Sequence, residues 1–406
     1  MTSLDQTRKD VEAATTKLLA YCKANDWAGY EPYDALNSPL LRALPFLDSR
    51  IPRLALTQAL KRSPVNIRAL MRIPKTQNPK ALAIFLSAFV RLSEIGFNGS
   101  EACIDQMIDR LIALRSAGTK YWCWGYSFPW QTRTVLVPLW SPNLVCTSFA
   151  ATALVEVYER RGDSRCLEMA VSAADYLVKE LYWSKSDGTA GFGYPLPSVR
   201  NQVHNANFLG ADLLCRVYRH TGEKRFLEPA FKAARYSAAQ QRADGSWDYG
   251  ESPSQKWIDN FHTGFNLSAL HCIGRYAETT EFVTRIERGL EFYRKYFFRE
   301  DGAVRYYHDQ TYPIDTHCVA QSVITLLDLK DIDPDNISLA HSVWRWAMDH
   351  MWDDRGFFYY RILRSCTIRT PYMRWTQAWM FLALSRLLVD SRQEARPASR
   401  ETIIQA

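Results

Sequence analysis

Residues 204–245 read HNANFLGADLLCRVYRHTGEKRFLEPAFKAARYSAAQQRADG, and this stretch decides the fold. It contains an apolar helix ending near Tyr218, a turn at Gly222, a second helix, and the acidic turn Asp244-Gly245. Glycine is typical of the residue after a helix, because it adopts left-handed backbone angles without strain. The stretch therefore predicts a hairpin of two helices.

The same hairpin pattern recurs along the chain. Alignment on the helix-ending residues Tyr158, Tyr218 and Tyr276 defines one register, which continues toward the C-terminus in steps of 60, 58, 55 and 57 residues. Residues that share one position in this register are Leu144, His204, His262, His317 and Arg374. A long period with two helices in each unit indicates a helical-hairpin array, in which no single unit buries its own apolar face.

The array predicts an all-α fold, a closed (α/α)6 helical-hairpin toroid with short β-hairpin loops at one rim. We expect one toroid domain over residues 1–392 and a polar C-terminal tail over 393–406. The expected helices lie near residues 5–25, 52–72, 77–95, 100–117, 145–160, 164–181, 204–220, 223–241, 262–277, 280–297, 317–329, 336–351 and 374–390.

Composition narrows the class of protein. The 406 residues are 47% hydrophobic and carry a net charge of +7, with basic residues spread along the chain, so a nucleic-acid partner is not expected. Nine cysteines without close pairs predict reduced thiols and a cytoplasmic location. The sequence shows no secretion signal and no membrane-spanning segment, and its oligomeric state stays open. No motif indicates a cofactor or a resident metal.

A closed toroid places the first helix of each hairpin at the centre, and the loops before these helices open on one face. His204, His262, His317 and Arg374 then surround the mouth, where imidazole serves as a general base and Arg374 binds a carboxylate or phosphate. The predicted catalytic residues are His262, His317, His204, Tyr306, Tyr249, Asp259 and Asp315. A histidine at a helix start also caps or packs, and Asp259 and Asp315 suit N-caps equally well.

Aromatic residues follow each acidic glycine turn, and a dense aromatic cluster spans residues 121–133. Aromatic faces combined with polar side chains are typical of sugar binding, because a pyranose ring presents C–H groups to an aromatic ring and hydroxyls to polar partners. The predicted substrate-binding residues are Trp124, Tyr126, Trp130, Gln131, Arg133, Asn205, Trp247, Asp248, Trp257, Asn260, Tyr307, Tyr312, Tyr360, Arg361, Tyr372, Arg374, Trp375 and Gln377.

Other chemistries stay open at this stage. Hydrolysis requires two carboxylates, for which Asp248, Glu251, Asp259 and Asp315 are candidates. Three histidines on neighbouring helices also suit zinc if all lean inward. The element from Gln241 to Trp247 matches a motif of squalene-type terpene cyclases, although the acid-rich motifs of those enzymes are missing.

Several strings resemble those of a bacterial family associated with exopolysaccharide and lipopolysaccharide biosynthesis. They are residues 29–38 (GYEPYDALNS), 124–126 (WGY) with 130–131 (WQ), 259–265 (DNFHTGF), 312–317 (YPIDTH) and 371–379 (PYMRWTQAW). More distantly, the pattern is similar to toroid carbohydrate enzymes: glucuronyl C5-epimerases, N-acylglucosamine 2-epimerases and unsaturated glucuronyl hydrolases. The resemblance implies a toroid fold and a sugar or acidic glycan as substrate, but no agreed reaction. Uronate epimerase or lyase chemistry is slightly preferred over hydrolysis, and a non-catalytic glycan-binding scaffold remains an alternative.

Overall fold

The computed structural model describes residues 3–44 and 48–394. The six inner helices are α4 (Pro79–Glu94), α6 (Leu144–Arg161), α8 (His204–Thr221), α10 (Asn260–Tyr276), α12 (Thr316–Asp328) and α14 (Trp379–Glu394). The six outer helices are α1 (Ser3–Ala24), α5 (Ser100–Ala113), α7 (Ser164–Tyr176), α9 (Lys224–Ala239), α11 (Val283–Phe297) and α13 (Asp335–Met351). Short π-helical segments continue α7 (η3, Leu177–Leu181) and precede α14 (η5, Met373–Ala378).

These helices form a closed ring of contacts. Each inner helix packs against the next, and α14 packs against α4, which completes the circle. The outer partner of α14 is the N-terminal helix α1, so the sixth hairpin joins the two ends of the described chain. The predicted (α/α)6 toroid is confirmed.

Short strands occupy the loops that lead from outer to inner helices, as predicted. The two-stranded antiparallel pairs are β1 (Trp130–Gln131) with β2 (Leu136–Val137), β3 (Tyr182–Ser184) with β4 (Ala190–Phe192), and β6 (Trp352–Asp353) with β7 (Phe357–Phe358). A three-stranded sheet has the order β5 (Ile314–Asp315), β8 (Arg361–Ile362), β9 (Thr367–Ile368). Because the hairpins are antiparallel, all these loops lie on the face where the inner helices begin.

Local sequence sets the helix ends. Gly162 and Gly222 follow α6 and α8 with φ of 71° and 69°, left-handed values that glycine adopts without strain. At the opposite end, Asn143, Asp259 and Asp315 accept hydrogen bonds from backbone N–H groups of α6, α10 and α12. These N-caps fix where each inner helix begins and therefore which side chains reach the centre of the ring.

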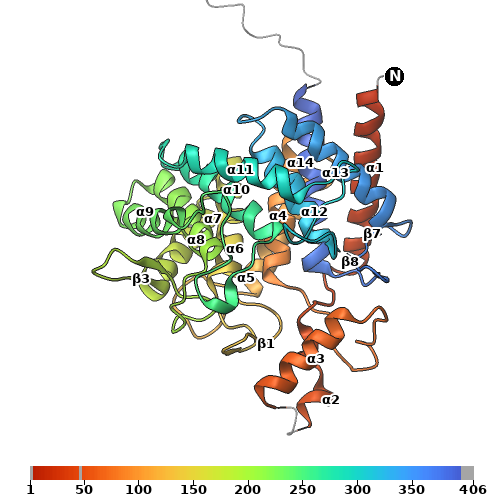
Figure 1. The fold of residues 1–406 in the computed structure, drawn as a ribbon, viewed down its shortest axis with the longest axis horizontal. Coiled ribbons are helices and arrows are strands. Elements are labelled where there is room, and N and C mark those ends of the chain that lie inside the picture. The colour runs from red at the N-terminus through yellow and green to blue at the C-terminus, as the bar shows by residue number, and fades with distance from the viewer. Residues whose placement is uncertain (1–2, 45–47, 395–406) are drawn as a thin grey trace, which may run out of the picture.

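One segment does not belong to the ring. After α1, the chain forms a short 3-10 turn (η1, Asp34–Asn37), then α2 (Pro39–Arg42) and α3 (Arg50–Arg62), which extend away from the ring in Figure 1. We call the described residues 39–44 and 48–75 the projection. The helix expected over residues 52–72 ends at Arg62, because Ser63 is extended before Pro64.

The predicted tail over residues 393–406 lies outside the described residues, apart from residues 393–394 at the end of α14. All nine cysteines are free thiols, and seven of them are buried. None of the helices in the described ranges combines the length and apolar character needed to cross a bilayer.

Candidate active site

The second residues of α4, α6, α8, α10 and α12 and of η5, the segment before α14, share one helical position, which we call the central layer. They are Lys80, Val145, Asn205, Phe261, His317 and Arg374. Alignment on the tyrosines predicted one shared position for the three histidines. In the structure, His204 is the first residue of α8, His317 the second residue of α12 and His262 the third residue of α10. The three histidines therefore occupy three different helical positions and have different surroundings.

His317 lies in the middle of the ring. Its imidazole stacks between Phe261 and Trp379, with ring centroids 4.6 and 4.7 Å away, and meets Trp375 edge-on. It is 1% exposed, and neither ring nitrogen has a hydrogen-bond partner among the described residues. Burial and the charges of Lys80 and Arg374 hold the pKa of His317 well below its usual value, so the ring is neutral at pH 7.

His262 forms a pair with Asp259. The Nδ1 atom of His262 lies 2.7 Å from Asp259 Oδ2, and the same carboxylate accepts the Trp257 indole N–H at 2.9 Å. Asp259 is 2% exposed and also caps α10, so its position is fixed. This pairing orients the imidazole of His262 and leaves its Nε2 atom available, while the ring packs on Phe261 with centroids 4.0 Å apart.

Arg374 is already bound to a carboxylate of this chain. Its guanidinium contacts both oxygens of Glu31, at 2.9 and 2.7 Å, and both side chains are buried. Two other carboxylates have partners elsewhere, because Asp315 binds Arg361 and Glu251 accepts a hydrogen bond from Tyr236. Burial raises the pKa of Glu31 to about 7, against the opposing charge of Arg374.

Lys80 is a site residue that the sequence analysis missed. Its ammonium nitrogen lies 4.2 Å from the centroid of Phe149, 5.4 Å from Trp379 and 5.5 Å from Phe265. Burial, helped by the charge of Arg374, lowers the pKa of Lys80 to about 7. No carboxylate among the described residues forms an ion pair with it. Its amine therefore changes charge near neutral pH inside an aromatic enclosure.

Aromatic side chains lie on the face of the ring where the inner helices begin, and we call this face the mouth. Tyr249 stacks on Trp257 with centroids 4.5 Å apart and contacts His262 at 4.6 Å. Tyr126 lies under the Arg374 guanidinium at 5.1 Å. The predicted residues Trp130, Tyr249, Trp257 and Tyr307 are half-buried here, whereas Tyr126, Tyr306, Tyr360, Tyr372 and Trp375 are buried and Tyr312 is exposed.

Asp315 organises the wall behind His317. Its carboxylate accepts hydrogen bonds from Arg361 Nε at 2.7 Å and from Trp375 Nε1 at 3.0 Å, and it caps α12 through the backbone N–H of His317. The side chain is fully buried. All of its near contacts are donors from this chain, so Asp315 positions neighbouring groups and has little capacity left for a ligand.

His204 faces away from the centre. Its Nδ1 atom lies 3.2 Å from Ser237 Oγ on the outer helix α9. Burial lowers the pKa of His204 to about 4, so the ring is neutral. The structure therefore separates His204 from His262 and His317, and we leave it out of the proposed site.

Several predicted binding residues are engaged inside the scaffold. Trp124 and Trp247 donate indole N–H bonds to the backbone oxygens of Leu111 and Ser237. Asp248 forms ion pairs with Arg242 and Lys256. The buried amides of Asn260 and Gln377 bond to Ser322 and to Phe358, respectively.

Gln131, Arg133 and Asn205 lie around the loops of the mouth. Gln131 accepts a hydrogen bond from Arg53 at 3.2 Å. Arg133 is exposed, bonds to the backbone oxygen of Ser254, and lies over Trp257. Asn205 is buried, and its Oδ1 atom has no partner among the described residues.

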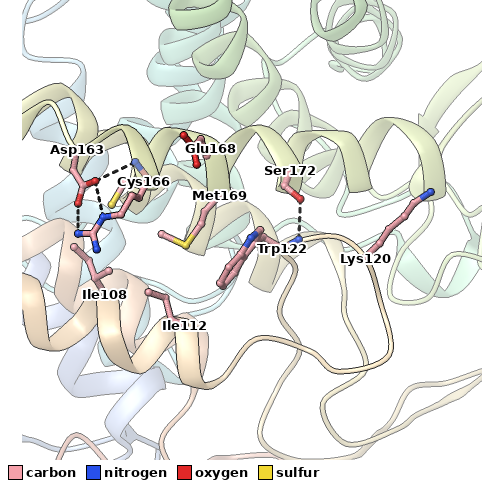
Figure 2. Close-up of a pocket in the computed structure, with 10 residues that line it drawn as sticks. Ile108, Ile112, Lys120, Trp122, Asp163, Cys166, Glu168, Met169 and Ser172 are labelled. Carbon is pink, nitrogen blue, oxygen red and sulfur yellow. Dashed lines mark hydrogen bonds and ion pairs between the residues drawn. The ribbon is translucent and has the colours of Figure 1, made fainter.

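A surface groove lies elsewhere, on the outer wall between α5 and α7 (Figure 2). It encloses about 450 Å³, and Trp122 lies beside Ser172, which accepts its backbone N–H at 3.0 Å. None of the predicted site residues lines this groove. Within residues 3–44 and 48–394, no group of three His, Cys, Asp or Glu side chains is arranged to hold a metal ion.

Other missed residues lie in the segment that follows α1. Glu31 binds Arg374, and Tyr33 packs edge-on against Trp375 with centroids 5.7 Å apart. In the sequence analysis, residues 29–38 contributed only to the family resemblance. They lie outside the repeat, so the repeat did not indicate them as site residues. The sequence could have indicated Lys80 as a site residue. Asn78-Pro79-Lys80 is a helix start, and Lys80 has the same helical position as His317.

The sequence matches no family model and no curated protein. The fold is similar to that of cellobiose 2-epimerase from Spirochaeta thermophila, with TM-score 0.58, 16% identity, and coverage of 79% of this chain and 87% of that chain. Unsaturated glucuronyl hydrolase from Streptococcus agalactiae gives TM-score 0.60, 12% identity, and coverage of 96% and 93%. A family 76 α-mannanase from Bacteroides thetaiotaomicron gives TM-score 0.61, 11% identity, and coverage of 78% and 87%.

Proposed function

We propose that this protein is a carbohydrate-active enzyme that binds a sugar at the centre of the ring and transfers a proton at a substrate carbon, as an epimerase, isomerase or lyase does. The observation that carries the proposal is the buried, neutral His317, whose two ring nitrogens have no partner among the described residues. Buried polar atoms are normally hydrogen-bonded, so this imidazole has unused capacity for a ligand. Toroid enzymes named as a cellobiose epimerase and a D-mannose isomerase support the same class of substrate.

In the proposed mechanism, His262 transfers the proton and the neutral His317 binds the substrate. His262 Nε2 removes a proton from the carbon beside a carbonyl or carboxylate, and the C–H electron pair moves to the carbonyl oxygen. Asp259 stabilises the imidazolium that forms, because it lies 2.7 Å from Nδ1. The His262 imidazolium then gives this proton, or one exchanged with solvent, to the same or the adjacent carbon as the electron pair moves back. His317, which shares the Phe261 contact, holds the substrate by a hydrogen bond through its unpartnered ring nitrogens.

Lys80 is suited to stabilise the developing negative charge on the substrate, whereas the charge of Arg374 is opposed by its ion pair with Glu31. Lys80 and Arg374 share the central layer with His317 and both interact electrostatically with it. Positive groups that are fixed in a buried site stabilise an oxyanion without reorganisation during the reaction. These charges are consistent with an acidic sugar, such as a uronate, as the substrate. A role in bacterial polysaccharide biosynthesis is part of the proposal and rests on the family resemblance of the sequence.

Hydrolysis is less well supported by the carboxylates. Asp248 and Asp315 are bound to cations, Asp259 is bound to His262 and Trp257, and Glu251 accepts a bond from Tyr236. A hydrolase requires one carboxyl to donate a proton and a second to act on water or the sugar carbon. No pair among these four is free of protein partners in the described chain.

The test uses the purified protein in D₂O with cellobiose, mannose, N-acetylmannosamine and a glucuronate disaccharide, followed by NMR. We expect deuterium at a substrate carbon, with about 100-fold or greater loss of the exchange rate in His262→Asn and in His317→Asn. His204→Asn is the matched control and keeps the exchange rate, since its ring faces α9. Bond cleavage without carbon deuteration, or full exchange in both variants, would overturn the proposed mechanism.

A further inference from the structure

The net charge of the protein is concentrated in the projection. Residues 39–75 contain eight lysine and arginine residues and one aspartate, so their net charge of +7 equals that of the whole chain. The rest of the chain is neutral by the same count. Basic residues are spread along the sequence as expected, and over the rest of the chain the acidic residues equal them in number.

Most of these cations are unneutralised. Arg53 pairs with Asp48 and Arg68 pairs with Asp34, and Lys61 donates to the Tyr33 hydroxyl at 2.7 Å. The other five are exposed and form no ion pair with any described residue: Arg42, Arg50, Arg62, Arg72 and Lys75. The projection therefore presents a surplus of positive charge to its surroundings.

The same segment carries exposed aliphatic side chains. Ile51 is 76% exposed and Leu70 is 78% exposed. Six of the twelve exposed large apolar residues in the described chain lie in the projection: Leu40, Leu44, Ile51, Val65, Ile67 and Leu70. Clustered exposed apolar groups mark interaction surfaces on soluble proteins.

The root of the projection is firmly attached to the ring. Arg68 is 1% exposed, bonds Asp34 at 2.8 Å and lies over the Tyr372 ring. Because the projection belongs to the loop from the outer helix α1 to the inner helix α4, it lies on the same face as the mouth. Its contacts through Lys61 and Tyr33 connect it to the mouth directly.

We propose that the projection docks on the surface of an anionic lipid membrane. Cations and aliphatic side chains together suit this partner, because the cations attract anionic headgroups while the aliphatic groups enter the headgroup boundary. A nucleic acid would use the charges but leave the aliphatic groups unburied. A second copy of the same face is disfavoured, because two surfaces of +7 repel each other. Docking brings the mouth to the membrane surface and does not depend on the proposed reaction.

The test is cosedimentation of the full-length protein with phosphatidylcholine vesicles and with vesicles containing 30% phosphatidylglycerol, roughly the level at which surface charge attracts basic segments. We expect binding to the anionic vesicles that weakens as salt rises. The double variant Arg50→Gln/Arg62→Gln should lose about tenfold or more of the partition coefficient, and Ile51→Ser/Leu70→Ser should also bind more weakly.

Matched controls come from the opposite face, where inner helices end. Lys224→Gln/Arg275→Gln removes two exposed cations there, and Val283→Ser/Ile332→Ser removes two exposed aliphatic groups. Both controls should bind like the parent protein, with circular dichroism used to verify folding of every variant. Absence of binding to anionic vesicles at low salt overturns the proposal. Equal binding to neutral vesicles, or binding only to RNA added as a competitor, also overturns it.

Discussion

The ring and the projection differ in sequence repetition, in the burial of apolar side chains and in net charge. The ring repeats one hairpin, buries its apolar side chains and is neutral as a whole, whereas the projection repeats nothing, exposes half of the large apolar groups found on the described surface and carries all the net charge. The comparison shows that the repeat determines the framework, while the loops between hairpins carry what distinguishes this protein. Experiments that treat the two regions alike should therefore give unequal results.

The largest effect is expected at Glu31 and Arg374, which join the segment after α1 to the last inner helix. Arg374→Met leaves a buried carboxylate without its partner, so we expect a loss of about 3–5 kcal/mol in the free energy of unfolding. Urea denaturation measures this loss. The double variant Glu31→Gln/Arg374→Met should recover part of the loss, and failure to recover any would mean that the pair is not the cause.

The same substitution in the two regions tests the comparison directly. Leu86 is fully buried in α4, so Leu86→Ala should cost about 2–5 kcal/mol of unfolding free energy. Leu70 is 78% exposed in the projection, so Leu70→Ala should change it by about 0.5 kcal/mol or less. Similar costs at both positions would show that the projection has a core of its own comparable to that of the ring.

Acid should weaken the ring through His204. The pKa of His204 is about 4 in the folded protein and about 6.5 when unfolded, so the unfolded state binds the proton first as pH falls. Stability contributed by the neutral ring is complete above pH 6.5 and is lost toward pH 4, by up to about 3 kcal/mol. Chemical denaturation at several pH values should show a smaller acid loss in His204→Asn than in the parent, and an unchanged slope would contradict the assignment.

A smaller effect is expected where α10 and α12 approach closely. A Cβ atom on Gly264 would lie 2.7 Å from Thr325 Oγ1 and 2.9 Å from Gln321 Cγ. Gly264→Ala should therefore cost about 1–3 kcal/mol, measured by thermal unfolding. Gly274→Ala in the same helix is the control, because its nearest neighbour would be 3.2 Å away, and it should cost clearly less.

The fold was predictable because the repeat is written in residues that act locally. Gly222 ends one helix and an acidic glycine turn ends the next. The period of the apolar pattern then indicates an array of helical hairpins. The site was only partly predictable. His262 and His317 were found, but alignment on helix ends placed His204 beside them, since the inner helices differ in length, from 13 residues in α12 to 18 in α8.

Contacts between distant segments were beyond the sequence. Glu31 lies outside the repeat and pairs with Arg374 through a bond that only the closed ring creates. The partners of Asp315 likewise come from β8 and η5, which no local pattern connects to α12. Alignment on the N-cap residues Asn78 and Asp315 would have found Lys80, because the cap fixes the register at the end where the site is formed.

The pairing of α1 with α14 has a consequence for biosynthesis. Among the described helices, α1 is made before all the others and its partner α14 is made after them, so the apolar face of α1 stays uncovered until α14 has been synthesised. Every other hairpin forms from adjacent helices and needs no such delay. A nascent chain interrupted before α14 would therefore keep an open flank on both α1 and α4, which chaperones and proteases recognise.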